Sequence, residues 1–454
     1  MKNLTVENIL NACGGSFHGD AGILRREVAA VTTDSRRVTP DCLFAAISGE
    51  RTDGHLYIAS AAASGALCAL GERVPQGFGG SMITVADTVT ALQRMAAFYR
   101  RQFDIPVIGI TGSVGKTTAK EMLYSVLSRR YSVLKTQGNF NNTLGVPLTL
   151  FGLREGHEAA VIEMGINHFG EMSVLAEIAR PTAAVFTVIG DAHLEFLGSR
   201  QGVLRAKTEM LKFMDEGAPV FVNGDDPLLR SLPCASLTTY GLGADCGVRA
   251  ENVVSGENGT MCDIATPSGR FSVSIPAYGD HMVYAALAAA AVAKRLGLTD
   301  EEIAGGISDY VPMSGRARLI KCGKLTIIDD CYNSNPSSAS MALASLSRMS
   351  GRRVAVLGDM LELGAHSAEL HRSLGELAAQ KCFLALCCGD FAQDMAEGAG
   401  ECGAAFADTD ALLTALPEFI RPHDAVLVKA SHSMGFERVT ERLKEIEASW
   451  NCAE

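Results

Sequence analysis

The segment from Val107 to Thr118 reads Val-Ile-Gly-Ile-Thr-Gly-Ser-Val-Gly-Lys-Thr-Thr, a composition and spacing suited to binding phosphate. Its glycines allow backbone N–H groups to converge on an anion, and the helix expected to follow adds its N-terminal dipole. Lys116 can reach the outer phosphates of a nucleotide, and the Thr117 hydroxyl can ligate magnesium. The residues predicted to form this phosphate cradle are Gly112, Ser113, Val114, Gly115, Lys116, Thr117 and Thr118.

The spacing of the cradle departs from the common GxxxxGK[ST] pattern. Counted from Gly112 the loop is one residue shorter than the pattern, and counted from Gly109 it is one residue longer. The prediction therefore depends on context, because an apolar strand precedes the loop and an amphipathic helical pattern follows it. A glycine-rich turn that binds no ligand is the alternative.

Three further residues could contribute to metal binding or catalysis. Glu163 ends an apolar strand, where a charge is costly without a partner, and this favours a magnesium ligand. His193 could bind a second magnesium ion, although a lone histidine is more often structural. Lys207, considered by itself, is equally consistent with a solvated cation on a helix.

Clusters of polar side chains could contact a substrate. Asn139, Asn141, Asn142 and Thr143 form a dense group that suits hydrogen bonding to a carboxylate or a peptide, or simply a turn. Near the N-terminus, polar loops beside strand ends could hold a nucleotide-sugar diphosphate. The residues concerned are Ser35, Arg36 and His55, and ordinary turn charges are the alternative explanation for Asp34 and Arg36.

A third set follows strands near the C-terminus. Asp330 could hydrogen-bond ribose hydroxyls, and Asn333 could face a phosphate or a base. Arg316, just after a Pro- and Gly-containing linker at 310–315, could contact a phosphate when domains close. Lys429 and Ser431 offer an ammonium and a hydroxyl group to an anion.

Positioning these groups requires buried parallel strands, at whose carboxyl ends ligands bind. Continuous apolar runs separated by helical patterns predict such strands throughout the chain. The predicted strands are 43–47, 66–70, 82–85, 107–110, 159–163, 183–188, 218–222, 325–329, 354–358, 383–388 and 425–429. Segments around 240–275 predict a small β excursion. Together they predict an α/β protein with an N-terminal domain at 1–84, a central domain at 85–312 and a C-terminal domain at 313–454.

Bulk properties exclude some classes of protein. The 454-residue chain is 47% hydrophobic, carries a net charge of −11, and therefore is not expected to bind nucleic acid non-specifically. Its N-terminus lacks a signal-peptide core, and its longest apolar run, 285–293, is far below the roughly 20 residues of a membrane helix. The 13 cysteines are scattered without paired metal-ligand spacing, so we expect buried free thiols rather than a zinc site. We also expect a cytoplasmic protein.

Taken together, these stretches resemble the Mur ligases of peptidoglycan synthesis over nearly the whole chain. The resemblance includes Thr33-Asp-Ser-Arg36, Asp53-Gly-His55, the phosphate cradle, Gly138–Pro147, Glu163–Asn167, Gly190–Glu195, Ala206–Glu209, Asp330–Pro336, Gly358–Gly364 and Val428–Ser431. The Tyr-Asn-x-Asn-Pro and Gly-Asn-x-Asn-Asn stretches resemble the sequences of the family branch that adds D-alanyl-D-alanine. A related ligase with another amine substrate, such as the third-residue-adding enzyme or folylpolyglutamate synthase, and a non-catalytic nucleotide-binding homologue are the alternatives.

The resemblance implies three domains: a UDP-substrate domain, a P-loop-like ATPase domain with a parallel sheet, and a Rossmann-like domain. It also implies ligation of D-alanyl-D-alanine to UDP-N-acetylmuramoyl-tripeptide through an acyl phosphate, with ATP and Mg²⁺ as cofactors and a monomeric enzyme. By position, Lys116, His193 and Lys207 would be catalytic. Magnesium would bind Thr117, Glu163, His193 and Lys207, the last as a carbamate.

The resemblance also implies which residues contact the ligands. Arg316, Asp330 and Asn333 would contact the nucleotide, and the N-terminal and Asn-rich polar clusters would contact the UDP-substrate. Three positions depart from the family pattern, which usually has Asn at Ala285 and more often has Gly at Ala430 and Arg at His432. Because histidine is shorter and only partly charged near neutral pH, any anion contact of an arginine at that position would be weakened.

Overall fold

The computed structural model describes residues 1–49, 52–191, 193–256 and 259–451 of the chain. The chain folds into two compact units. The first unit comprises Met1–Thr111, Tyr131–Val185 and Thr208–Pro219. The second unit comprises Gly112–Arg130, Phe186–Lys207 and Val220–Glu454.

The first unit begins with a five-stranded sheet of order β1-β5-β4-β3-β2. All its pairs are parallel except β1 with β5. The strands are β1 (Ser16–His18), β2 (Val31–Thr32), β3 (Leu43–Ala45), β4 (Cys68–Gly71) and β5 (Met82–Thr84), with helices α1 (Val6–Cys13) and α2 (Ile58–Ala63). Phe44, Ile58 and Met82 form its buried core, so the three strands predicted here are confirmed.

The other strands of the first unit run in the order β9-β6-β8-β7. They are β6 (Val107–Thr111), β7 (Val133–Lys135), β8 (Ala159–Glu163) and β9 (Ala183–Phe186). The pairs β6–β8 and β7–β8 are parallel, and every residue of β6 and β8 is buried, which accounts for their continuous apolar sequences. Helices α3 (Thr88–Arg100), α5 (Gly145–Leu150) and α6 (Glu171–Ala179) belong to this unit.

Strands of the second unit first run in the order β14-β13-β12-β11-β10. They are β10 (Val220–Asn223), β11 (Leu237–Gly241), β12 (Val248–Gly256), β13 (Gly259–Thr266) and β14 (Gly269–Ile275). The pairing changes from parallel to antiparallel at β12, which confirms the predicted β excursion. The apolar run 285–293 is buried in helix α10 (Asp280–Arg295), which packs against α4 (Lys116–Leu127) and α11 (Asp300–Ser308).

The C-terminal part of the second unit has a six-stranded sheet of order β15-β16-β20-β17-β18-β19. The strands are β15 (Arg318–Cys322), β16 (Leu325–Asp329), β17 (Arg352–Gly358), β18 (Leu384–Cys388), β19 (Gly403–Phe406) and β20 (Asp424–Lys429). All neighbours are parallel except β15 with β16. At β16, β20 and β17 the strand order departs from the chain order, which is where α/β sheets bind ligands.

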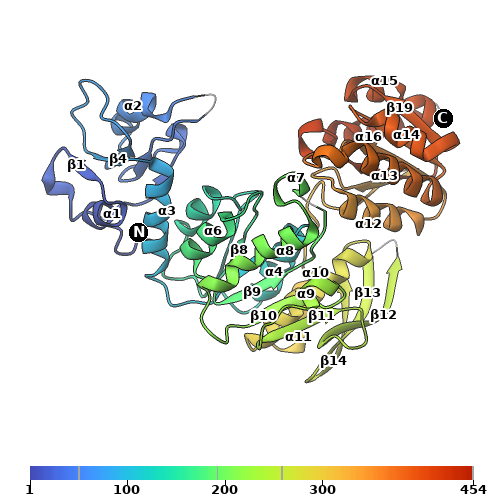
Figure 1. The fold of residues 1–454 in the computed structure, drawn as a ribbon, viewed down its shortest axis with the longest axis horizontal. Helices are drawn as coiled ribbons and strands as arrows, with labels where there is room; N and C mark the ends of the chain where they lie inside the picture. Colours follow the sequence, from blue (N-terminus) through green and yellow to red (C-terminus); the bar gives the residue numbers. More distant parts are fainter. Residues whose placement is uncertain (50–51, 192, 257–258, 452–454) are drawn as a thin grey trace. The chain divides into compact units, whose positions relative to one another are not determined.

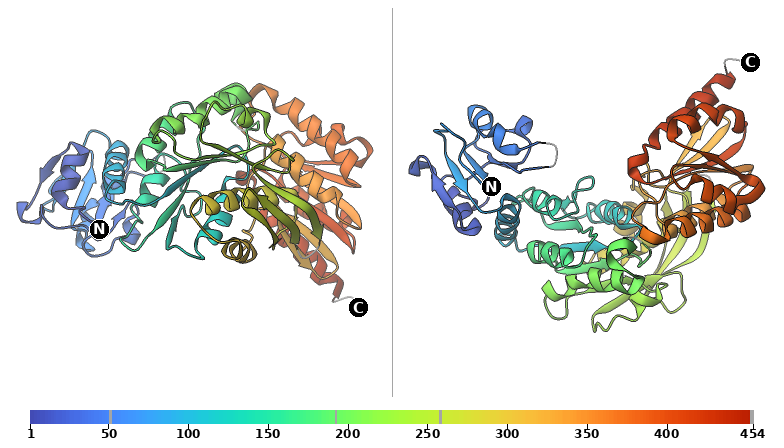
Figure 2. Two further views of the ribbon diagram at one scale, coloured as in Figure 1. Left: turned by 90° about the horizontal axis from the view of Figure 1, so that it is seen from below. Right: turned by 45° about the horizontal axis from the view of Figure 1, so that its top comes forward.

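Helices cover both faces of this C-terminal sheet (Figures 1 and 2). One core lies under α12 (Pro336–Ser347), α13 (Ser367–Lys381) and α14 (Ala392–Ala399). The other lies under α15 (Thr409–Phe419) and α16 (Glu437–Asn451). This arrangement accounts for the apolar runs within the central strands and confirms the Rossmann-like prediction.

Two further findings concern the predictions from composition. The twelve cysteines in the described part of the chain are free thiols, and most of them are buried. Burial raises the pKa of Cys13 and of Cys68 to about 12, so these thiols are protonated and unreactive near neutral pH. Among the described helices, none is both long and apolar enough to cross a membrane.

Candidate active site

The phosphate cradle lies in the second unit, where its loop leads directly into α4. Gly115 precedes the helix with φ of +84°, a conformation that favours glycine. The Ser113 amide donates to the Val188 carbonyl at 2.7 Å, and the Gly190 amide donates to Ser113 Oγ at 2.9 Å. Thr187 Oγ1 donates to the Val114 carbonyl at 2.6 Å. The cradle is thus held in shape by the segment 187–190.

Gly112 shows why the cradle tolerates no side chain. Its φ is +148°, and a Cβ built there would lie 1.9 Å from Thr187 Oγ1. We expect Gly112→Ala to lose about 1–3 kcal/mol of stability through overpacking and to raise the KM for ATP at least ~10-fold, because the loop must open to fit the methyl group. Thermal unfolding and initial-rate kinetics measure the two effects.

The matched control is Gly156→Ala, where no atom lies within 4 Å of the added Cβ and φ is not in the left-handed region. This control should behave like the wild type in both measurements. Unchanged ATP affinity in the Gly112 variant would show that the loop does not cradle the nucleotide.

Two lysine amino groups of the second unit belong to the region of the cradle, Lys116 and Lys207. Lys116 Nζ donates to the Gly112 carbonyl at 2.8 Å, so it already lies over the loop. Lys207, on α8 (Arg200–Thr208), is only 1% exposed. Burial first, and then the charge of Lys116, lower the pKa of Lys207 well below its ordinary value. Both causes favour the neutral form of this amine over its charged form.

His193 lies at the start of α7 (Leu194–Leu197), in the left-handed conformation with φ of +58°. The segment leading to it is anchored, because the Ile189 amide donates to Asp226 Oδ2 at 2.7 Å. Asp191 Oδ2 accepts a hydrogen bond from Ser337 Oγ of α12 at 3.0 Å. The imidazole Nδ1 lies 2.5 Å from Glu362 Oε2.

The predicted nucleotide residues Asp330 and Asn333 lie next to Lys429 at the carboxyl ends of β16 and β20. Lys429 Nζ donates to Asp330 Oδ2 at 2.7 Å and to the Asn333 carbonyl at 2.9 Å. Asp330 Oδ1 accepts the Ala317 amide at 3.1 Å. Each carboxylate oxygen keeps a lone pair for a ligand. The Lys429 ammonium group thus holds Asp330 in place, and the anion contact predicted for Lys429 stays a prediction.

Arg316 is part of a stack that the sequence analysis missed. Its guanidinium carbon lies 3.8 Å from the centroid of the Tyr332 ring. The Tyr332 ring also stacks with His432, whose ring centroid lies 4.9 Å from that of Tyr332 at an interplanar angle of 29°. Tyr332 therefore packs against both His432 and Arg316.

The first unit contains Glu163 and the asparagine cluster. Glu163 is 2% exposed, its amide donates to Thr136 Oγ1, and its Oε1 accepts Asn141 Nδ2 at 2.8 Å. Asn142 Oδ1 accepts the amides of Leu144 and Gly145 and so caps α5. Asn141 therefore contacts Glu163, a predicted metal ligand. Asn142 instead stabilises the turn before α5, which was the alternative role considered for this cluster.

Thr143 and Asn139 are less constrained by side-chain contacts. The Thr143 carbonyl accepts Gln93 Nε2 at 3.0 Å, and the Asn139 carbonyl accepts the Asn141 amide at 2.7 Å. Asn139 is exposed. Both residues are thus held through their backbone carbonyl groups.

The residues predicted near the N-terminus also differ in how far their side chains are engaged within the chain. His55 is 4% exposed; its Nδ1 lies 2.7 Å from Asp53 Oδ1, and its Nε2 accepts the Glu72 amide at 2.8 Å. With both ring nitrogens bonded, His55 orders the loop rather than offering a nitrogen to a substrate. Arg36 is exposed and paired with Asp34 in a bidentate contact, and Ser35 starts the same turn.

The donor atoms present fit a magnesium ion that is held mainly by its nucleotide. Among the described residues, no group of three or more His, Cys, Asp or Glu side chains is arranged to hold a metal ion. Magnesium typically takes one or two protein oxygens and completes its shell with phosphates and water. The buried hydroxyl of Thr117 and the carboxylate of Glu163 are donors of that hard-oxygen kind.

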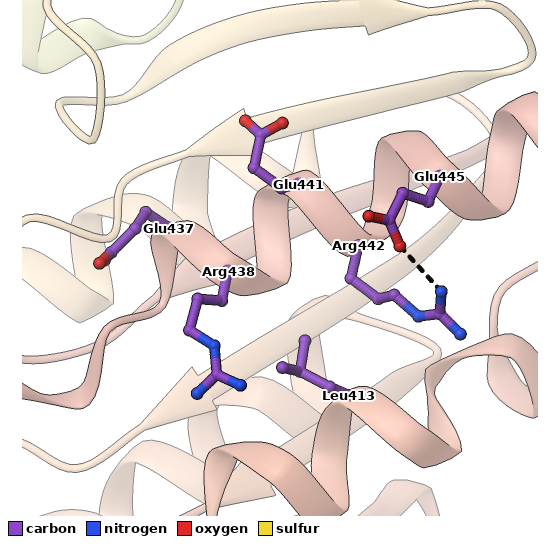
Figure 3. A pocket seen from close by; sticks show the side chains of 6 residues that line it. All are labelled: Leu413, Glu437, Arg438, Glu441, Arg442 and Glu445. Atoms are coloured by element: carbon purple, nitrogen blue, oxygen red, sulfur yellow. Dashed lines mark hydrogen bonds and ion pairs between the residues drawn. The ribbon is translucent and has the colours of Figure 1, made fainter.

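A groove on the C-terminal helices is a separate feature (Figure 3). It has a volume of about 310 Å³ and is lined by Leu413, Glu437, Arg438, Glu441, Arg442 and Glu445. Arg442 pairs with Glu445 at 2.8 Å, so opposite charges within the groove compensate each other. It contains none of the predicted site residues.

Comparison with known proteins identifies the class to which this fold and site belong. The chain matches three domain families: "Mur ligase family, catalytic domain" at residues 27–100, "Mur ligase middle domain" at residues 110–293, and "Mur ligase, glutamate ligase domain" at residues 315–432. The chain belongs to the Mur ligase family, whose members are ATP-dependent, ADP-forming ligases.

Within the family, similarity extends over the whole chain to one kind of ligase. The UDP-N-acetylmuramoyl-tripeptide–D-alanyl-D-alanine ligase of Bacillus subtilis (strain 168) is 36% identical over 98% of this chain and 99% of its own length. A crystal structure of MurF from Acinetobacter baumannii superimposes with a TM-score of 0.91 at 34% identity, covering 97% of this chain and 98% of that one.

A MurF ligase from Thermotoga maritima in complex with ADP has a TM-score of 0.84 at 28% identity, covering 92% of this chain and 98% of that one. The architecture is accordingly that of three α/β domains with a parallel sheet in the central one, as predicted. The similarity also confirms the predicted resemblance to the ligases that add D-alanyl-D-alanine.

Proposed function

We propose that this protein ligates D-alanyl-D-alanine to UDP-N-acetylmuramoyl-tripeptide, with hydrolysis of ATP to ADP and phosphate, in peptidoglycan precursor synthesis. The observation that carries the proposal is the full-length similarity to ligases of that activity. The site agrees with it, since the second unit combines a phosphate cradle, a buried lysine and the Asp330–Lys429 pair.

The chemistry follows from the weak electrophilicity of a carboxylate. The tripeptide carboxylate attacks the γ-phosphorus of ATP, ADP leaves, and an acyl phosphate forms. The amine of D-alanyl-D-alanine then adds to the carbonyl carbon, and phosphate departs from the tetrahedral intermediate with loss of the amine proton. Lys116 and the cradle amides stabilise the charge that develops on the transferred phosphoryl group.

Magnesium, when bound, neutralises phosphate charge and orients the phosphoryl group. Thr117 and Glu163 would hold one ion with the nucleotide, and His193 would hold a second. The Asn141 side chain donates a hydrogen bond to the Glu163 carboxylate. The role of Asn141 is therefore to orient that carboxylate for metal binding. Arg316, Asp330 and Asn333 are the proposed nucleotide contacts on the C-terminal side.

Lys207 is the proposed carbamate. A neutral lysine amine adds to CO₂, forms an N–C bond and releases a proton, which converts a buried amine into an anion. The lowered pKa of Lys207 supplies the neutral form that this addition needs. The resulting carboxylate oxygens are hard ligands that suit magnesium.

The remaining assignments concern the substrate and the setting. Ser35 and Arg36 would line the UDP-substrate side, with His55 ordering the loop, and Asn139 and Thr143 would contact the peptide. We place the domain boundaries at 84/85 and 312/313, because β5 ends at Thr84 and β15 begins at Arg318. We also propose a monomer acting in the cytoplasm, where its nucleotide substrates are made.

The function is tested by measuring ADP release while each substrate is omitted in turn. With ATP and Mg²⁺, we expect ADP release only when both UDP-tripeptide and D-alanyl-D-alanine are present, together with a product whose mass is the sum of the two substrates less one water. Running the assay with tripeptides ending in diaminopimelate or lysine identifies the acceptor. ADP release that does not depend on D-alanyl-D-alanine would refute the proposal, and no turnover with nucleotide still bound would indicate a non-catalytic homologue.

A further inference from the structure

The segment Gly358-Asp-Met-Leu-Glu362-Leu-Gly364 follows β17, and the proposed reaction assigns it no role. In the second unit its glutamate lies against the proposed metal ligand His193, although 169 positions separate them in sequence. His193 Nδ1 and Glu362 Oε2 are 2.5 Å apart. The histidine side chain is 20% exposed and the glutamate side chain 44% exposed.

The backbone around the pair indicates that the contact is built into the fold. His193 and Glu362 both adopt left-handed conformations, with φ of +58° and +62°, which cost about 1 kcal/mol or more for residues other than glycine. Neighbouring residues hold both loops in place. The Ile189 amide donates to Asp226, and the Leu361 amide donates to Ser431 Oγ at 3.0 Å.

The hydrogen bond determines which ring nitrogen can bind a metal. An ionised carboxylate only accepts hydrogen bonds, so the proton between the two groups belongs to Nδ1. In a neutral imidazole Nε2 then carries the lone pair. Metal-binding histidines commonly have this arrangement, in which a carboxylate on the far nitrogen fixes the tautomer and the ring orientation.

We propose that Glu362 is a positioning residue that holds His193 in the Nδ1–H tautomer and presents Nε2 to the second magnesium ion. The inference rests on the proposed function, because it requires His193 to be a ligand. It also makes one metal ligand depend on a segment of the C-terminal domain, which contributes the nucleotide residues Asp330 and Asn333.

The first test is spectroscopic and uses the full-length, metal-free protein with ¹⁵N-labelled histidine. Long-range ¹H–¹⁵N correlation spectra distinguish the two tautomers, and the His193→Gln variant identifies the His193 signals by their absence. We expect an Nδ1–H tautomer for His193 in the wild type and its loss in Glu362→Ala. A change in fold alone would not selectively alter this one ring.

The second test measures Mn²⁺ binding by electron paramagnetic resonance in the presence of a non-hydrolysable ATP analogue. We expect Glu362→Ala to weaken the His193-dependent site about 10- to 100-fold. Glu369→Ala is the matched control, since it removes an exposed carboxylate from the same region of the chain. This control should bind Mn²⁺ like the wild type.

Three results would overturn the inference. Wild-type tautomer and Mn²⁺ binding in Glu362→Ala would show that the contact positions nothing, while leaving the ligase function intact. Tighter Mn²⁺ binding in that variant would show that Glu362 competes with the metal. Unchanged Mn²⁺ binding and ligation in His193→Gln would show that His193 is not a ligand, which also refutes that part of the proposed function.

Discussion

Replacement of Lys116 by methionine is expected to lower kcat for D-alanyl-D-alanine-dependent ADP release by about 10²–10³-fold. The ammonium group lies over the phosphate loop, 2.8 Å from the Gly112 carbonyl, and only a cation there can offset charge on the transferred phosphoryl group. Methionine keeps most of the side-chain volume, so the folded structure should remain. Steady-state kinetics with saturating substrates, together with the thermal unfolding midpoint, measure both quantities.

Lys212→Met is the control for the loss of one positive charge, because Lys212 is exposed and lies outside the cradle. It should retain wild-type kcat. A Lys116 variant whose KM for ATP rises while kcat stays unchanged would indicate ground-state binding only, contrary to the proposed role in phosphoryl transfer.

Replacement of Lys207 by alanine is expected to reduce ligation at least ~10²-fold, and small carboxylates such as formate or acetate should restore part of the rate. The lysine is 1% exposed, and a truncated side chain leaves room for a free carboxylate in place of the proposed carbamate. Native mass spectrometry of the wild type should show a CO₂ adduct that is lost on acid denaturation. Initial rates with and without added carboxylate give the degree of rescue.

Lys120→Ala provides the matched comparison, since Lys120 is also fully buried and lies 3.1 Å from Glu121. Its loss should destabilise the fold without any response to carboxylates. Equal rescue of both variants, or a fully active Lys207→Ala enzyme without additives, would remove the basis for a carbamate at Lys207.

The local elements of this fold were largely predictable because each depends on short-range pattern. Strands β8 and β16 have the predicted bounds, since unbroken apolar runs are required where both faces of a parallel strand are buried. The missed strands β1, β2, β7, β15 and β19 each lie at the edge of a sheet. Sequence reasoning has least information for such strands, because their pairing is decided by the neighbouring strand.

Side-chain roles were predictable only where the residue type dictates the chemistry. Gly112 and Gly115 were predicted as parts of a tight loop because their residue type favours positive φ, and both have positive φ in the structure. For His55 the sequence leaves two roles open, since an imidazole serves equally well as a ligand or as a buried hydrogen-bonding group. Its bonds to Asp53 and to the Glu72 amide decide the matter.

The sequence by itself determined the class of this protein: a phosphate cradle between a buried strand and a helix, within an α/β chain of the Mur ligase family. Only the tertiary structure decided how distant residues pair, including His193 with Glu362, Asp330 with Lys429, and Tyr332 with His432. The physical reason is that the cradle arises from backbone geometry over a few consecutive residues. The pairs instead depend on which loops the sheets bring together, and no local pattern encodes that.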